Sequence, residues 1–102
     1  MRVKNKMLYD RYIGRLVQVE LNQLAQKGDV YLGRIKETDG DFILLNPFVL
    51  VHTGYYDAEE NAKEEVKGIE ASEKIKQRRE KEGKLEILLN KEVIANITPI
   101  GE

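Results

Sequence analysis

The sequence predicts a mainly β fold: a small five-stranded open barrel with an N-terminal helix and a charged helical insertion between strands three and four. Short apolar segments with strand-like alternation recur between turn signals. Gly33 interrupts one of these segments, and a hairpin-type Asp39-Gly40 pair follows it. A long run of helix-forming residues, about 56–84, separates the third apolar segment from the fourth.

The composition fits one small domain that spans residues 1–102. The net charge is −1, so nucleic-acid binding would need a local basic patch. The chain has no cysteine and one histidine, which excludes disulfides and argues against zinc sites, and we expect neither a metal nor a cofactor. The N-terminus has no apolar signal segment, and the longest apolar run, 42–51, is too short to span a bilayer. We therefore expect a cytoplasmic protein without membrane association.

The N-terminal segment 5–15 predicts a short helix, because Leu8 and Tyr12 are four residues apart and fall on one face. The first fifteen residues contain five bases and one acid, so this helix would carry a basic surface. The next segment, 16–21, alternates apolar and polar residues, which is the pattern of a half-buried strand.

The second strand is predicted over 30–38, where Gly33 indicates a bend, a bulge or a close backbone approach. The Asp39-Gly40 pair predicts the turn into the third strand, 42–52. Pro47 cannot donate a backbone hydrogen bond, so we expect this long strand to bend there.

The insertion has segregated charge. Residues 57–73 carry seven acids and two bases, whereas residues 74–84 carry six bases and two acids. This order suggests two helices packed antiparallel around Gly68, or one helix that pairs with a neighbouring subunit; partial disorder is the alternative. The last two strands are predicted over 84–90 and 92–97.

The residues that carry a family resemblance form two groups. The first has two glycines, an isoleucine, an aspartate and an apolar triplet at fixed spacing: Gly28, Gly33, Ile35, Asp39 and Ile43-Leu44-Leu45. The second, near the end of the chain, is Asn90-Lys91-Glu92-Val93-Ile94, followed by Pro99. Outside the insertion, the chain resembles the Sm-like family of LSm and Hfq-like proteins. A divergent, phage-type member is the closest subtype.

The resemblance implies an SH3-like barrel that assembles into a ring and grips single-stranded RNA. Each subunit of the family offers a stacking side chain, a polar base-reading side chain and a cationic side chain. Here Asp41 stands at the stacking position and Ile43 at the base-reading position, and only Lys91 keeps the cationic role. The resemblance therefore implies RNA binding without the usual uridine pocket.

RNA contact is expected at a basic pore or at the face of the N-terminal helix, with two tyrosines beside the insertion as stacking candidates. The candidate RNA-binding residues are Lys91, Arg11, Arg15, Lys6, Tyr55 and Tyr56. Each has a structural alternative. Lys91 could be a solvated turn residue, and the basic residues of the N-terminal segment could serve solubility. The two tyrosines could pack the insertion onto the barrel. The motif residues Gly28, Gly33 and Asp39 are expected to serve turns and the barrel bend.

Assembly follows from the edges of the sheet. An open barrel leaves unpaired strand edges that a neighbour can complete, so we expect a cyclic homo-oligomer. The candidate interface residues are apolar positions of strands four and five: Leu85, Ile87, Leu89, Val93, Ile94 and Ile97. The alternative function is a non-enzymatic scaffold in which residues 57–83 dock another protein. His52 has no evident catalytic partner in the sequence, and no phosphate-binding loop is present, so we do not expect an enzyme.

Overall fold

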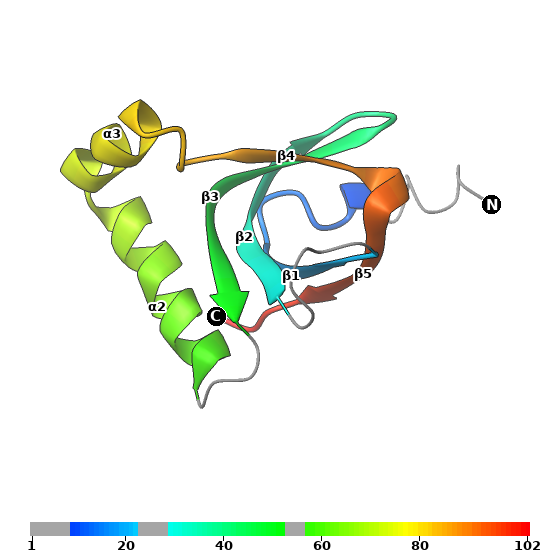
Figure 1. The fold of residues 1–102 in the computed structure, drawn as a ribbon, viewed down its shortest axis with the longest axis horizontal. Helices are drawn as coiled ribbons and strands as arrows, with labels where there is room; N and C mark the ends of the chain where they lie inside the picture. The colour runs from blue at the N-terminus through cyan, green and yellow to red at the C-terminus, as the bar shows by residue number, and fades with distance from the viewer. Residues whose placement is uncertain (1–8, 23–28, 53–56) are drawn as a thin grey trace.

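The computed structural model describes residues 9–22, 29–52 and 57–102. Over these residues the fold is a five-stranded antiparallel sheet, with two helices inserted between the third and fourth strands (Figure 1). The elements, in chain order, are β1 (Leu16–Leu21), β2 (Asp29–Thr38), β3 (Phe42–His52), α2 (Ala58–Ala71), α3 (Glu73–Lys81), β4 (Ile87–Asn90), the 3₁₀ turn η1 (Lys91–Val93) and β5 (Ile94–Pro99).

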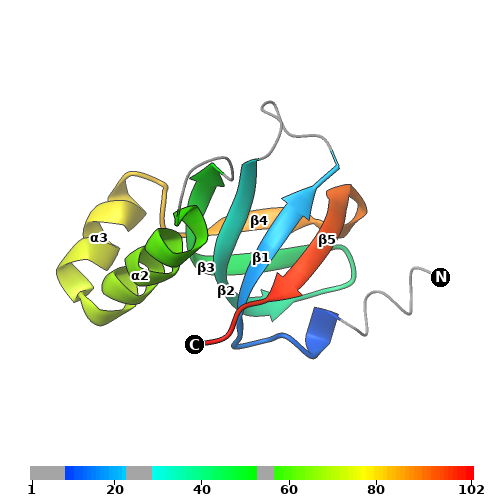
Figure 2. The ribbon, with the colours of Figure 1, turned by 90° about the horizontal axis from the view of Figure 1, so that it is seen from below.

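The strands lie in the order β4-β3-β2-β1-β5, so β4 and β5 form the two edges of the sheet. The sheet curves strongly, and η1 carries the chain from one edge to the other without the edges pairing (Figures 1 and 2). The predicted mainly β, five-stranded architecture is therefore present as an open sheet. β4 is shorter than predicted, since it starts at Ile87, whereas β5 (Ile94–Pro99) has the predicted length but lies two residues later in the chain.

The close approach of β2 and β3 depends on Gly33. A Cβ atom built on Gly33 would lie 2.6 Å from the carbonyl oxygen of Pro47 and 3.0 Å from the Cβ of Phe48. Gly33 pairs with Phe48, and Ile35 pairs with Leu45, so β3 holds one extra residue beside Pro47. This bulge reverses the faces to which the following β3 side chains point.

Two apolar cores result from that reversal, one on each side of the sheet. The α2-side core contains apolar residues of the sheet and of α2: Leu16, Val30, Leu32, Val49, Val51, Ala62, Val66, Ile69, Leu85 and Ile100. The barrel-side core fills the concave face of the sheet: Val17, Val19, Ile35, Ile43, Leu45 and Leu89. β3 contributes to both cores, on either side of the bulge.

The insertion forms two helices, and the break between them differs from the prediction. α2 continues through Gly68 and buries Ala62, Val66 and Ile69 against the sheet. The break falls at Ser72, whose hydroxyl accepts a hydrogen bond from the Ile75 amide at 3.2 Å and so caps α3. A helix interior can hold glycine at a modest cost, so Gly68 alone did not end the helix.

The N-terminal helix predicted over residues 5–15 is also placed differently. Of the described residues in that range, only Tyr9 and Asp10 are helical, and a turn follows them. Gly14 ends this turn with a φ of +85°, a conformation that glycine adopts without strain, and its amide donates to the Ile35 carbonyl oxygen at 2.8 Å. Nowhere in the described part of the chain is a helix both long and apolar enough to cross a membrane.

Candidate nucleic-acid interface

The predicted cation Lys91 lies in η1, where its side chain is turned toward the protein. The residue is only 9% exposed, and its ammonium donates a hydrogen bond to the carbonyl oxygen of Asp39. The same ammonium lies 5.2 Å from the centre of the Tyr9 ring, a cation–π distance. Its backbone amide donates to the Asp41 carbonyl oxygen at 2.7 Å. Lys91 therefore joins η1 to the β2–β3 turn and to the N-terminal segment.

The β2–β3 turn is held by its own aspartate. The Asp39 carboxylate accepts hydrogen bonds from the amides of Asp41 and Phe42, at 2.8 and 2.7 Å. The Asp39 amide donates to the Phe42 carbonyl oxygen at 3.0 Å, which closes the hairpin. This side-chain-to-backbone pattern is how an aspartate fixes a tight turn. The carbonyl oxygen of Asp39 is then positioned to accept the hydrogen bond from Lys91.

The structure places two residues that the resemblance singled out, Asp41 and Ile43, where neither offers a uridine pocket. Ile43 is fully buried in the barrel-side core, so it cannot present a group to a base. Asp41 is exposed, and its carboxylate would repel phosphate rather than stack on a base. Neither position therefore offers a side chain that could stack on a base or read its edge, as the sequence indicated.

The N-terminal segment carries two exposed cations. Arg11 and Arg15 are both exposed, and the Arg15 guanidinium lies 5.9 Å from the centre of the Tyr12 ring. Backbone hydrogen bonds tie this segment to β2, because the Ile35 amide donates to the Arg15 carbonyl oxygen at 3.1 Å. Burial raises the pKa of Tyr9 above its usual value, so that ring stays neutral beneath the Lys91 ammonium.

Carboxylates are mixed with these cations. Asp10 accepts a hydrogen bond from the Thr38 hydroxyl, and Glu92 is part of η1 itself. The Glu92 amide donates to the Asn90 side-chain oxygen at 2.8 Å, which caps the 3₁₀ turn. With Asp39 and Asp41 also nearby, the surface around η1 is one of mixed charge. A phosphate group approaching this surface would meet its exposed cations on the N-terminal segment, at Arg11 and Arg15.

Four predicted residues, Lys6, Gly28, Tyr55 and Tyr56, lie outside the described residues. The six candidate interface positions divide into three kinds. Leu85 and Leu89 are buried in the two cores, so a single chain already uses them. The three isoleucines at positions 87, 94 and 97 pack partly against the barrel-side core. Val93 is 39% exposed.

The structure adds Leu88 to the candidates for a subunit interface. This residue of the edge strand β4 is 57% exposed and points away from the core that its neighbours fill. The alternation of β4 could have indicated it, because Leu88 lies between Ile87 and Leu89, which both face the barrel-side core.

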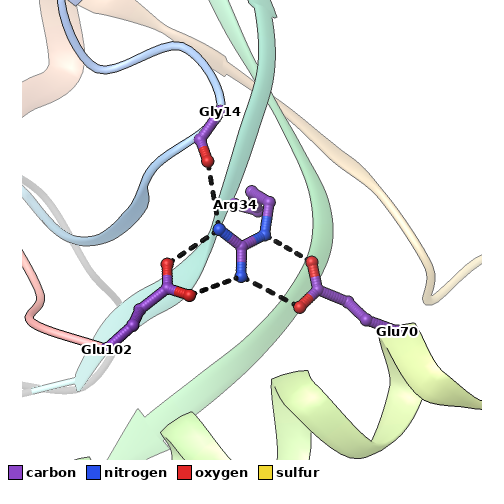
Figure 3. Close-up of polar contacts among 4 residues, drawn as sticks. All are labelled: Gly14, Arg34, Glu70 and Glu102. Atoms are coloured by element: carbon purple, nitrogen blue, oxygen red, sulfur yellow. Dashed lines mark hydrogen bonds and ion pairs between the residues drawn. The ribbon is translucent and has the colours of Figure 1, made fainter.

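Sequence reasoning also missed Arg34, which connects four parts of the chain (Figure 3). Its Nε and Nη2 donate to the two carboxylate oxygens of Glu70 on α2. Its Nη1 and Nη2 donate to the two carboxylate oxygens of Glu102, at 2.8 and 3.3 Å, and Nη1 also donates to the Gly14 carbonyl oxygen at 3.0 Å. The hydrogen bonds that Arg34 donates to Glu70, and then those to Glu102, raise the Arg34 pKa above its usual value, and Arg34 in turn lowers the pKa of Glu102.

Arg34 has a structural role, since the guanidinium gives all its hydrogen bonds to groups of the same chain. Its partners lie 20, 36 and 68 residues away, so local sequence held no signal for this arrangement.

His52, the last residue of β3, lies beside Asp29, the first residue of β2, with Nδ1 and the carboxylate oxygen 2.8 Å apart. Within the described ranges, no cluster of three or more histidine, cysteine or acidic side chains could hold a metal ion.

Comparison of the chain with protein-family models, with curated proteins and with solved structures finds no match.

Proposed function

We propose that this chain is a subunit of an Sm-like ring that binds single-stranded RNA without a uridine pocket. A curved sheet of five antiparallel strands, in the chain order that the resemblance implies, supports the Sm-like part of the proposal. The observation that carries the RNA part is the exposed pair Arg11 and Arg15 on a segment tied to β2 and close to η1. Arginine contacts to phosphate need no particular base, which fits a chain without base-reading groups.

Assembly through the sheet edges accounts for the apolar side chains of β4 and η1. Within one chain, β4 pairs with β3 alone and β5 with β1 alone in the described sheet. Exposed strand edges are completed readily by another strand, and a closed ring leaves none open. Leu88 and Val93, both exposed, would then be covered by the neighbouring subunit.

The experiment compares two variants in RNA binding over a series of salt concentrations. Arg11→Gln/Arg15→Gln removes two phosphate contacts, so the slope of log affinity against log salt concentration should fall by about 1.4. Lys91→Met, which removes an inward-facing ammonium, should lower stability but leave that slope unchanged. If Lys91→Met flattens the slope and the double variant does not, RNA contact belongs to η1 and the arginine assignment is wrong. If the wild-type protein binds no RNA, the proposed function fails.

The second candidate is a non-enzymatic scaffold that docks another protein through its insertion, 57–83. The observation in its favour is that α3 buries none of its residues within the chain. Deleting the insertion would not test it cleanly, because α2 supplies Ala62, Val66 and Ile69 to a core. Substitutions on the exposed face of α3 separate the two candidates without that damage. A cytoplasmic location, the lack of enzymatic activity and a phage-type origin stay predictions.

A further inference from the structure

The basic face of α3 forms a second candidate contact surface, far from the N-terminal arginines. We propose that Lys74, Arg78 and Lys81 contact the phosphate backbone of the RNA. The inference rests on the proposed function, since it assumes that the protein binds RNA at all. It goes beyond that function by assigning a phosphate contact to the inserted helix.

The three residues form one stripe along the helix. They follow one another at i, i+4 and i+7, so they lie within an arc of about 60° and extend over about 10 Å of the helix axis. All three side chains are exposed. A row of cations with this spacing can follow successive phosphates of a nucleic-acid strand.

The neighbouring cations of α3 have partners, whereas those of the stripe have none among the described residues. Lys76 pairs with Glu73 at 3.9 Å, and Arg79 pairs with Glu65 of α2 at 2.7 Å. Within the described part of the chain, Lys74, Arg78 and Lys81 make no ion pair or side-chain hydrogen bond.

Helix stability explains only part of the stripe. Arg78 and Lys81 lie in the last turn, where cations interact favourably with the helix dipole. Lys74 lies in the first turn, where a cation is unfavourable. The helix dipole therefore does not account for Lys74.

The chemistry of this face favours a polyanion over a protein. Ile75 is the one apolar residue of α3, and it packs toward the α2-side core. The exposed face therefore offers cations and Gln77 but no apolar or aromatic anchor, which protein interfaces need for most of their binding energy. Glu82, the residue that ends α3, lies beside Arg78 and lowers the potential of the stripe, so the contribution of the stripe is that of a few phosphate contacts.

The stripe also lengthens the surface over which one subunit could contact an RNA strand. α3 and η1 lie at opposite ends of the molecule (Figures 1 and 2), whose longest extent is 40 Å. An RNA strand that touches both ends of one subunit gains affinity because the second contact is intramolecular. In a ring, the same surface would recur on every subunit.

The test measures binding of a labelled single-stranded RNA of mixed sequence, about 20 nucleotides long, which exceeds a typical single-domain site. The variant Lys74→Gln/Arg78→Gln/Lys81→Gln removes three phosphate contacts, which lowers the salt slope by about 2. Raising the salt from about 50 to about 200 mM should then weaken the wild-type protein about 20-fold more than the variant.

Two control variants separate the stripe from charge and folding effects. One removes the same charge from β2 and α2, Lys36→Gln/Lys63→Gln/Lys67→Gln, and should keep the wild-type slope. The other, Lys74→Arg/Lys81→Arg, keeps the charge of the stripe and should keep its affinity. Circular dichroism checks that each variant is folded.

Each outcome supports or overturns the proposal. A salt slope that falls in Lys74→Gln/Arg78→Gln/Lys81→Gln and in neither control variant supports it. If the stripe variant Lys74→Gln/Arg78→Gln/Lys81→Gln has the same salt slope as the wild-type protein, the proposal is overturned and the arginine site is left as the RNA contact. Equal losses in both triple variants also overturn it, because general charge is then responsible. If every variant keeps RNA binding but the stripe variant no longer captures an acidic protein, the face belongs to the scaffold alternative and the proposal is overturned. A wild-type protein without RNA binding defeats the proposed function itself.

Discussion

Replacing Gly33 with alanine tests the central packing feature of the sheet. The new Cβ would lie 2.6 Å from the Pro47 carbonyl oxygen and 3.0 Å from the Phe48 Cβ. The nearest atom is backbone and cannot rotate away, so β2 and β3 must separate next to the bulge. Overpacking of this kind costs about 2–3 kcal/mol. For a domain of this size, that corresponds to a melting temperature about 10–20 °C lower.

The matched control is Gly68→Ala. Gly68 lies inside α2, and a Cβ built on it meets no atom within 4 Å. Alanine is favoured over glycine in a helix by about 1 kcal/mol, so this variant should be more stable than wild type. The two substitutions add the same methyl group and are expected to have opposite signs.

The assay is thermal and urea unfolding followed by circular dichroism. All proteins are compared at one concentration, since assembly would make stability depend on concentration. A Gly33→Ala protein that melts within about 4 °C of wild type would show a cost below about 1 kcal/mol. The argument that the two strands require a residue without a Cβ would then be refuted.

Three further predictions follow from the polar and apolar contacts. Arg34→Gln leaves Glu70 and Glu102 without their cation. The free energy of unfolding measured in urea should fall by about 1–2 kcal/mol. This is less than the loss for a fully buried pair, because the Arg34 side chain is 22% exposed. The pKa of Glu102 is lowered in the folded protein by Arg34, so its contribution to stability is present above pH 4.5 and is lost as the pH falls through the lowered pKa. Glu102→Gln should therefore reduce the loss of stability on acidification, and an unchanged acid limb would contradict the pairing. Leu88→Lys should leave the melting temperature of the isolated chain unchanged but lower the mass measured by light scattering; an unchanged oligomer would exclude β4 from the interface.

The strands could be predicted because their signals are local. β1 and β3 begin and end at the residues that alternation and the turn pair indicate. Gly33 was expected to mark a bend, a bulge or a close backbone approach, and the structure shows the close approach with a bulge beside it. A local pattern suffices where the pairing partner is the next strand in the chain.

The departures concern interactions that a local pattern cannot contain. The helix break lies at Ser72 instead of Gly68, because the extended Ser72 caps the start of α3 with its hydroxyl, whereas a glycine inside a helix costs only about 1 kcal/mol. Arg34 could not be recognised, since Glu70 and Glu102 reach it only in the folded chain. The sequence left open whether Lys91 is a pore cation or a solvated turn residue. It lies in a turn, but it is nearly buried rather than solvated, because its ammonium donates to the Asp39 carbonyl oxygen.

The bulge in β3 has a consequence for how the molecule opens. Because one strand supplies Ile43 and Leu45 to one core and Val49 and Val51 to the other, neither core can come apart without disturbing that strand. We therefore expect the β2–β3 amides to exchange their hydrogens with solvent only through global unfolding. Amides at the outer edges of β4 and β5 should exchange sooner, through local fraying. Two apolar clusters then behave as one cooperative unit, and the inserted helix α2 belongs to it.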